Sequence, residues 1–151
     1  YSLAGIRLGF CIAQESLIQG MMQVKDSYNV DRLSIDAVVA ALDDQKSMKA
    51  NVERIKETRR YLTGSLRDMG FFVYPSQTNF ILAQCMKGVS AHTLYQTLKS
   101  RKILVRYFNL RRLDDCLRIT IGTREEIDIL LKNLKEIIET KHLKKRDACC
   151  L

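Results

Sequence analysis

Residues 117–126 read Leu-Arg-Ile-Thr-Ile-Gly-Thr-Arg-Glu-Glu, and within this stretch one kind of secondary structure gives way to another. Large apolar side chains alternate with other residues up to Ile121, which is typical of a strand. Gly122 follows, and Thr123 is separated from Glu126 by the spacing of a capping box, the pattern that begins many helices. The stretch therefore predicts a strand followed directly by a helix, which we expect to end at about Thr140.

The preceding residues repeat this combination. Runs rich in β-branched and aromatic residues predict strands at 71–74, 79–84 and 103–107, and helical spacing predicts a helix at 91–100. Gly70 stands where a glycine ends a helix. Residues 71–140 are therefore expected to form a module with the order β-β-α-β-β-α.

The N-terminal half is predicted to be mainly helical. Residues 15–24 and those after Asp31 have helical spacing, with Asp31 or Ser34 as the cap, and a further helix reaches about residue 69. Asp43-Asp44-Gln45 either interrupts these helices or marks a polar face. The apolar run at 7–13 predicts a buried strand, and such a strand needs neighbours on both sides. We therefore expect an α/β chain that is a fragment of a longer protein.

Composition restricts the class of protein further. With 46% hydrophobic and 28% charged residues the chain is expected to be globular, and no run of apolar residues is long enough to cross a membrane. The net charge of +8 comes partly from a basic tail at 141–151 and partly from helix faces that also carry acidic residues. A nucleic-acid surface is the less favoured explanation. Cysteine spacing gives no zinc or disulfide framework, which favours a reducing cytoplasm, and three cysteines (Cys11, Cys85 and Cys116) lie in apolar contexts typical of burial.

Four polar residues are candidates for binding chemistry. Arg7 lies between Gly5 and Gly9, a context in which backbone and guanidinium can approach a phosphate, although the local pattern alone favours a surface arginine beside a turn. Asn79 begins an apolar strand, where it either binds a ligand or ends a turn. Arg106 and Arg118 each stand inside a strand-like apolar run. A guanidinium in such a place needs an anion or a carboxylate partner, so one shared anion pocket and two separate salt bridges both remain open.

The same segments carry a family resemblance. Residues 2–10, 75–80 and 117–126, together with Ser27-Tyr28-Asn29-Val30, resemble the histidinol-phosphate aminotransferases over residues 1–138. This resemblance implies the fold of the fold-type-I enzymes that use pyridoxal 5'-phosphate (PLP). It also implies a domain organisation: 1–45 from the PLP-binding large domain, 46–70 a connecting helix, 71–140 the small C-terminal α+β domain with a mainly antiparallel sheet, and 141–151 a basic tail.

The resemblance also implies roles for the candidate residues. Arg7 would bind the PLP phosphate, and Asn79 and Arg118 would face the substrate, with Arg118 on its acid group. Arg106 and Arg118 together would bind the phosphate of histidinol phosphate, because two guanidinium groups suit a dianion. The parent would be a homodimeric enzyme of histidine biosynthesis that exchanges an amino group between glutamate/2-oxoglutarate and histidinol phosphate/imidazole-acetol phosphate.

One departure from the family concerns catalysis. The lysine that holds PLP would lie two residues before Tyr1, so these 151 residues alone are expected to be inactive. No metal site is expected. Other possibilities are an aromatic aminotransferase or threonine-phosphate decarboxylase of the same superfamily, and a truncated module that binds a phosphate ligand or a partner without catalysis.

Overall fold

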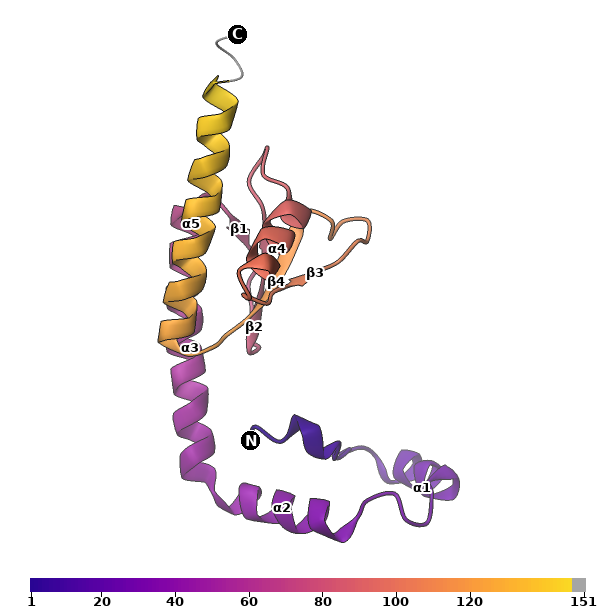
Figure 1. Ribbon diagram of the computed structural model, residues 1–151. Helices are drawn as coiled ribbons and strands as arrows, with labels where there is room; N and C mark the ends of the chain where they lie inside the picture. The colour runs from indigo at the N-terminus through magenta and orange to yellow at the C-terminus, as the bar shows by residue number, and fades with distance from the viewer. Residues whose placement is uncertain (148–151) are drawn as a thin grey trace. The chain divides into compact units, whose positions relative to one another are not determined.

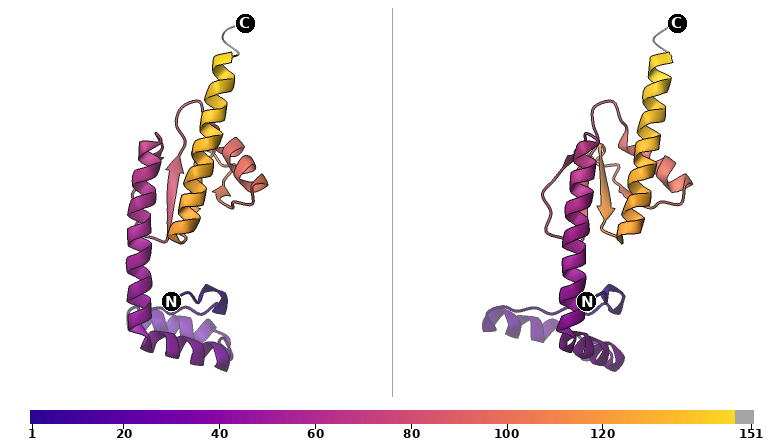
Figure 2. Two further views of the ribbon diagram at one scale, coloured as in Figure 1. Left: turned by 60° about the vertical axis from the view of Figure 1, so that its left-hand side comes forward. Right: turned by 90° about the vertical axis from the view of Figure 1, so that its left-hand side faces the viewer.

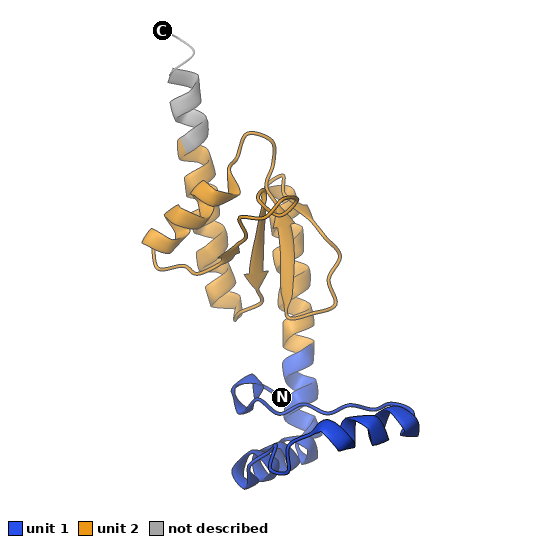
Figure 3. Cartoon of the chain, turned by 90° about the vertical axis from the view of Figure 1, so that its right-hand side faces the viewer, with its two compact units in different colours: residues 1–52 blue, residues 53–151 orange. Residues whose placement is uncertain are grey.

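The computed structural model describes residues 1–147 and consists of two compact units, residues 1–52 and 53–151 (Figure 3). Figure 1 labels the helices and strands in chain order. Their bounds are η1 Ala4–Ile6, α1 Glu15–Val24, α2 Arg32–Asp43, α3 Gln45–Asp68, β1 Phe72–Val73, β2 Phe80–Gln84, α4 Ala91–Ser100, β3 Arg106–Tyr107, β4 Cys116–Thr120 and α5 Arg124–Asp147. Helix α3 contributes residues to both units.

Unit 1 is helical and has little core of its own. Helix α2 begins where expected, because the Asp31 carboxylate accepts a hydrogen bond from the backbone nitrogen of Ser34 at 2.9 Å. The helix ends before Asp44, whose carboxylate accepts from Ser47 in the first turn of α3. No hydrophobic side chain within residues 1–52 is fully buried.

The strand expected at 7–13 is not formed. Among residues 1–52 the structure has no strand, and Phe10 and Ile12 are 79% and 89% exposed. An extended segment forms a strand only where a neighbour pairs with its N–H and C=O groups. Unit 1 offers no such neighbour. Cys11 lies in this segment and is exposed, so the burial expected for it is also wrong.

Unit 2 contains a four-stranded antiparallel sheet with the order β1-β2-β4-β3. The central pair is in register from Phe80 opposite Thr120 to Gln84 opposite Cys116. Helix α3 ends at its glycine, since Gly70 adopts a φ of 91° and the nitrogen of Phe71 bonds to the oxygen of Leu66. This turn sends the chain from α3 into the first strand.

Helices cover one face of the sheet. In both views of Figure 2, α5 and the later part of α3 run beside the strands of unit 2. The core contains inward-facing strand residues such as Ile81 and Ile119, packed with Leu66 of α3, Leu94 of α4 and Leu134 of α5. Burial alternates along β2 and β4, so their other side chains form the exposed face. The small α+β domain and its antiparallel sheet are therefore present.

The last helix, α5, begins where the sequence predicts but ends later than predicted. At its start, Thr123 and Glu126 form the capping box: Glu126 Oε2 accepts from the nitrogen of Thr123 at 2.8 Å, and Thr123 Oγ1 accepts from the nitrogen of Glu126 at 3.3 Å. At its other end, α5 continues to Asp147 rather than stopping at about Thr140. The expected tail therefore begins as helix, and residues 148–151, with Cys149 and Cys150, lie outside the described residues.

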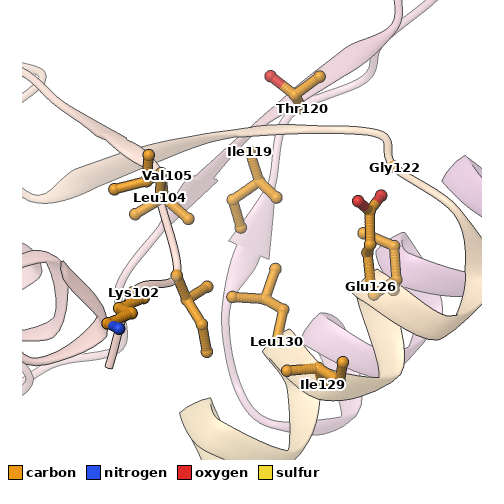
Figure 4. A pocket seen from close by; sticks show the side chains of 11 residues that line it. Lys102, Leu104, Val105, Ile119, Thr120, Gly122, Glu126, Ile129 and Leu130 are labelled. Atoms are coloured by element: carbon orange, nitrogen blue, oxygen red, sulfur yellow. The ribbon is translucent and has the colours of Figure 1, made fainter. Parts of the chain in front are cut away.

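The third strand is shorter than expected. Only Arg106 and Tyr107 pair with β4, while residues 103–105 leave the sheet edge. A pocket of about 370 Å³ lies between these residues, the end of β4 and the first turns of α5. Figure 4 shows it lined mainly by apolar side chains, with the Glu126 carboxylate at one side. Just after β4, the backbone nitrogen of Ile121 donates a hydrogen bond of 2.8 Å to the backbone oxygen of Asn79, which precedes β2.

Candidate functional site

Two arginines face each other on the exposed side of the sheet. Arg106 of β3 and Arg118 of β4 are direct partners in the antiparallel register, and both are exposed. Directly opposite residues in an antiparallel pair point to the same face. The structure therefore brings together the two arginines that the sequence placed in separate strand-like runs.

Aromatic rings line the two guanidinium groups. The Cζ atom of Arg106 lies 5.3 Å from the centre of the Phe108 ring, and that of Arg118 lies 5.6 Å from the same centre. Arg118 is also 5.3 Å from the ring of Phe80. The faces of these rings are weakly negative, so each contact is of the cation–π type. Phe108 is the ring that both arginines share.

No acidic side chain neutralises this pair. Among the side chains that the structure describes, no carboxylate lies within ion-pair distance of Arg106 or Arg118. Like charges placed directly opposite each other in a sheet are destabilising, and the rings compensate only in part. The salt-bridge explanation is therefore not supported, and the arrangement is suited to an external anion that two guanidinium groups can bind together.

Asn79 stands at the start of the neighbouring strand. Its side chain is exposed, and its backbone oxygen accepts the hydrogen bond from Ile121. The turn before it is held by Ser76 and Thr78, which both donate to the oxygen of Phe80, and Arg59 of α3 donates to the oxygen of Thr78 at 2.6 Å. These bonds fix the entry into β2, so Asn79 has a defined backbone position next to the end of β4.

Arg7 lies in the other unit. It follows η1 directly and adopts φ 60° and ψ 20°, the left-handed region that residues other than glycine rarely occupy. Its side chain is exposed, and among the described side chains no carboxylate pairs with it. Uncommon backbone conformations of this kind are concentrated at ligand-binding positions. The structure thus brings Arg106 and Arg118 together and leaves Arg7 in a separate unit.

Two neighbouring residues at the start of β4, Asp115 and Cys116, have shifted pKa values. Gln84 donates to the Asp115 carboxylate at 2.6 Å, and this bond, with a second from the Cys116 thiol, lowers the pKa of Asp115. Burial, together with Asp115, raises the pKa of the Cys116 thiol to about 12. The Cys116 side chain is fully buried, so its thiol is not open to a ligand bound by the arginines.

Sequence reasoning missed Phe80 and Phe108 as part of this site. Both are apolar residues, which the sequence alone does not distinguish from residues of a core. The available signal was the spacing of strands: Phe108 is two residues after Arg106, and Phe80 lies two residues before Leu82, the partner of Arg118. No group of three or more metal-ligating side chains occurs among the described residues, and no described helix is long and apolar enough to cross a membrane.

Comparison with known proteins identifies the family of this chain. The family described as aminotransferase class I and II matches residues 1–134, and the chain belongs to this family. Within it, the chain is 45% identical over 141 residues to histidinol-phosphate aminotransferase 1 of Nostoc sp., covering 93% of this chain and 40% of that protein. It therefore spans about two fifths of the length of this curated relative.

Solved structures agree on the fold. Histidinol-phosphate aminotransferase from Sinorhizobium meliloti, in complex with pyridoxal 5'-phosphate, has a TM-score of 0.82 and 28% identity, covering 93% of this chain and 39% of that one. A putative aminotransferase from Burkholderia pseudomallei has a TM-score of 0.81 and 32% identity, covering 89% and 41%. The α/β class with a small C-terminal domain is thereby confirmed as the fold of PLP-dependent aminotransferases.

Proposed function

We propose that this chain is the C-terminal part of a PLP-dependent aminotransferase that exchanges an amino group between glutamate/2-oxoglutarate and histidinol phosphate/imidazole-acetol phosphate. The observation that supports this most directly is the un-neutralised pair of Arg106 and Arg118, side by side on one sheet face. Two guanidinium groups can each donate two parallel hydrogen bonds to a phosphate dianion. The names of the curated relatives point to the same substrate.

The two arginines would have overlapping roles. Arg118 would bind the acid group of the amino or keto acid, and Arg106 would join it when the substrate carries a phosphate. One guanidinium serves both anions because carboxylate and phosphate present oxygens at a similar spacing. Asn79 would face the substrate from the start of β2, where its exposed amide can donate or accept a hydrogen bond. Such contacts orient the substrate rather than perform the chemistry.

Arg7 would bind the phosphate of PLP. The guanidinium of Arg7 fits that group, since it is exposed and has no carboxylate partner among the described side chains. The flanking Gly5 and Gly9 have open space around them, because a Cβ atom built on either one would have no neighbour within 4 Å. Bound PLP withdraws electrons from the substrate α-carbon, which makes its proton removable. The residues described here would contribute binding and orientation to that chemistry.

The parts of the chain would belong to different domains. Residues 1–45 would come from the large domain, 46–70 from a connecting helix, 71–140 from the small domain and 141–151 from a tail. The exposure of apolar residues in unit 1, such as Val24, Tyr28 and Leu33, supports this, because surfaces of this kind are normally covered by other parts of a protein or by a partner. We propose that the full-length enzyme is a homodimer and that it works in a reducing cytoplasm.

A chimera tests the proposed reaction. Residues 1–141 of this chain would replace the matching segment of the Nostoc relative, which supplies the rest of the fold. The expected result is transamination of histidinol phosphate with 2-oxoglutarate, dependent on added PLP. Restoring activity only with aromatic amino acids would favour an aromatic aminotransferase, and carbon dioxide release from threonine phosphate would favour a decarboxylase. A folded chimera without any of these activities would favour a non-catalytic binding module.

The 151 residues by themselves are proposed to be inactive. By the family resemblance, the lysine that holds the cofactor would correspond to none of them, and exposed lysines such as Lys25 would lie outside the matching motif. The isolated chain should acquire no cofactor absorbance with PLP beyond that of a control protein with equal lysine content. Turnover of histidinol phosphate by the isolated chain would contradict this proposal.

A further inference from the structure

Phe108 has a geometric position that no other described residue shares. Its ring centre is 5.3 Å from the Arg106 guanidinium carbon and 5.6 Å from that of Arg118. Phe80 contacts Arg118 alone, at 5.3 Å. Arg118 therefore has two rings and Arg106 has one, and Phe108 is the side chain through which the two arginines are connected.

This position addresses a physical difficulty in the site. Two guanidinium groups on directly opposite residues repel each other, and long arginine side chains on an open face have many other rotamers available. Without an anion, repulsion favours rotamers that separate them. A ring beside both groups attracts each of them while carrying no charge of its own.

We infer that Phe108 is a positioning residue for the phosphate site, holding Arg106 and Arg118 in the convergent arrangement before the dianion binds. This inference rests on the proposed function, in which the two arginines bind phosphate. Preorganisation of this kind strengthens binding because less side-chain freedom is lost when the ligand arrives. Since a dianion uses both arginines and a monoanion needs only one, the ring is expected to contribute selectivity for phosphate over a carboxylate.

The first experiment asks whether the shared contact exists in solution. In the 151-residue chain, the Nε–Hε resonances of Arg106 and Arg118 should both show ring-current shifts and proton contacts with the Phe108 ring. Phe108→Leu should move both resonances, whereas the matched control Phe80→Leu should move only that of Arg118. The wild-type contacts decide the geometry even if the leucine variant does not fold, and their absence overturns the inference.

The second experiment measures the consequence for binding. The same resonances are followed while inorganic phosphate is added, and separately acetate, at constant ionic strength. Phe108→Leu is expected to raise the dissociation constant for phosphate about fivefold, from the usual strength of such contacts, and that for acetate about twofold or less. Phe108→Tyr keeps the ring and should restore phosphate binding to within about twofold of wild type. Equal weakening for both anions, or no recovery with tyrosine, would indicate a general structural role and overturn the inference.

Arg106→Ala and Arg118→Ala separate this inference from the function on which it rests. If both variants weaken phosphate binding while Phe108→Leu does not, the phosphate site stands and the positioning role is wrong. If neither arginine variant changes phosphate binding, the proposed phosphate site fails, and the role of Phe108 fails with it.

Discussion

Arg106 and Arg118 are direct partners across the β3–β4 ladder, both exposed, and both lie within 5.6 Å of the ring centre of Phe108. Neither has a carboxylate partner among the described side chains. Because the sheet register fixes the backbone separation of the two residues, an anion placed between their side chains can contact both. The relationship accounts for a basic site on a face that carries no helix of unit 2.

Removing either arginine should therefore weaken phosphate binding strongly. Hydrogen bonds to a charged group contribute about 1.5–3 kcal/mol, so Arg106→Ala or Arg118→Ala is expected to raise the dissociation constant for phosphate about tenfold or more in a titration followed by nuclear magnetic resonance. Combining the two changes should add less than the sum, since each removes part of one shared site. The exposed Arg60 of α3 supplies a charge-matched control, and an equal effect of Arg60→Ala would reduce the site to general electrostatic attraction.

The junction of β4 and α5 allows a test of stability. A Cβ added at Gly122 would collide with the Glu126 carboxylate, which also caps the helix by accepting from Thr123. Gly122→Ala should force that side chain away and cost about 1 kcal/mol of unfolding free energy, the usual value of a cap, measured by urea denaturation. In a Glu126→Ala variant, which lacks the obstructing carboxylate, Gly122→Ala should reduce the unfolding free energy by clearly less. Additive effects of the two substitutions would show that Glu126 is not the obstacle.

Much of unit 2 could be predicted because its signals are local. The spacing of Thr123 and Glu126 specifies the start of α5, and Gly70 specifies the end of α3, since each involves groups only a few residues apart. The helix at 91–100 was predicted with its bounds correct, because Ser90 caps it and its apolar residues repeat at helical spacing. These elements depend little on the rest of the protein.

Features that depend on distant partners were not predictable in the same way. The run at 7–13 has the composition of a strand, yet a strand requires a neighbouring strand, and none is present within residues 1–52. The strand expected at 103–107 keeps only its last two residues, because Ile103 and Leu104 leave the sheet at the pocket beside α5. The candidate arginines were found as separate residues. Their direct pairing follows from the register of β3 on β4, and the contact of both with the Phe108 ring follows from the fold of the chain after β3.

The Asp115 carboxylate should make stability depend on acidity. Its hydrogen bonds with Gln84 and Cys116 lower its pKa from an ordinary value of 3.8, so the folded protein favours the ionised form. This stabilisation is complete above pH 3.8 and is lost as the pH falls through the lower folded-state pKa. Gln84→Ala should therefore reduce the unfolding free energy near pH 6 by about half a kcal/mol, as for other exposed charged contacts, with the difference shrinking below pH 3.8. Gln96→Ala, on α4, is the control, and a difference independent of pH would rule out the carboxylate as its cause.

The cysteines offer a last test, of burial. Cys116 is fully buried, and its thiol, with a pKa raised to about 12 by burial and by Asp115, would be ionised in only roughly 10⁻⁴ of molecules at pH 8. Cys11 is exposed. Iodoacetamide at pH 8 should therefore modify Cys11 within minutes and leave Cys116 unmodified until urea unfolds unit 2, as judged by mass spectrometry of the separated peptides. Asp115→Asn should speed modification of Cys116 only slightly, since burial is the larger cause of its altered pKa. Rapid labelling of native Cys116 would contradict the burial of its side chain.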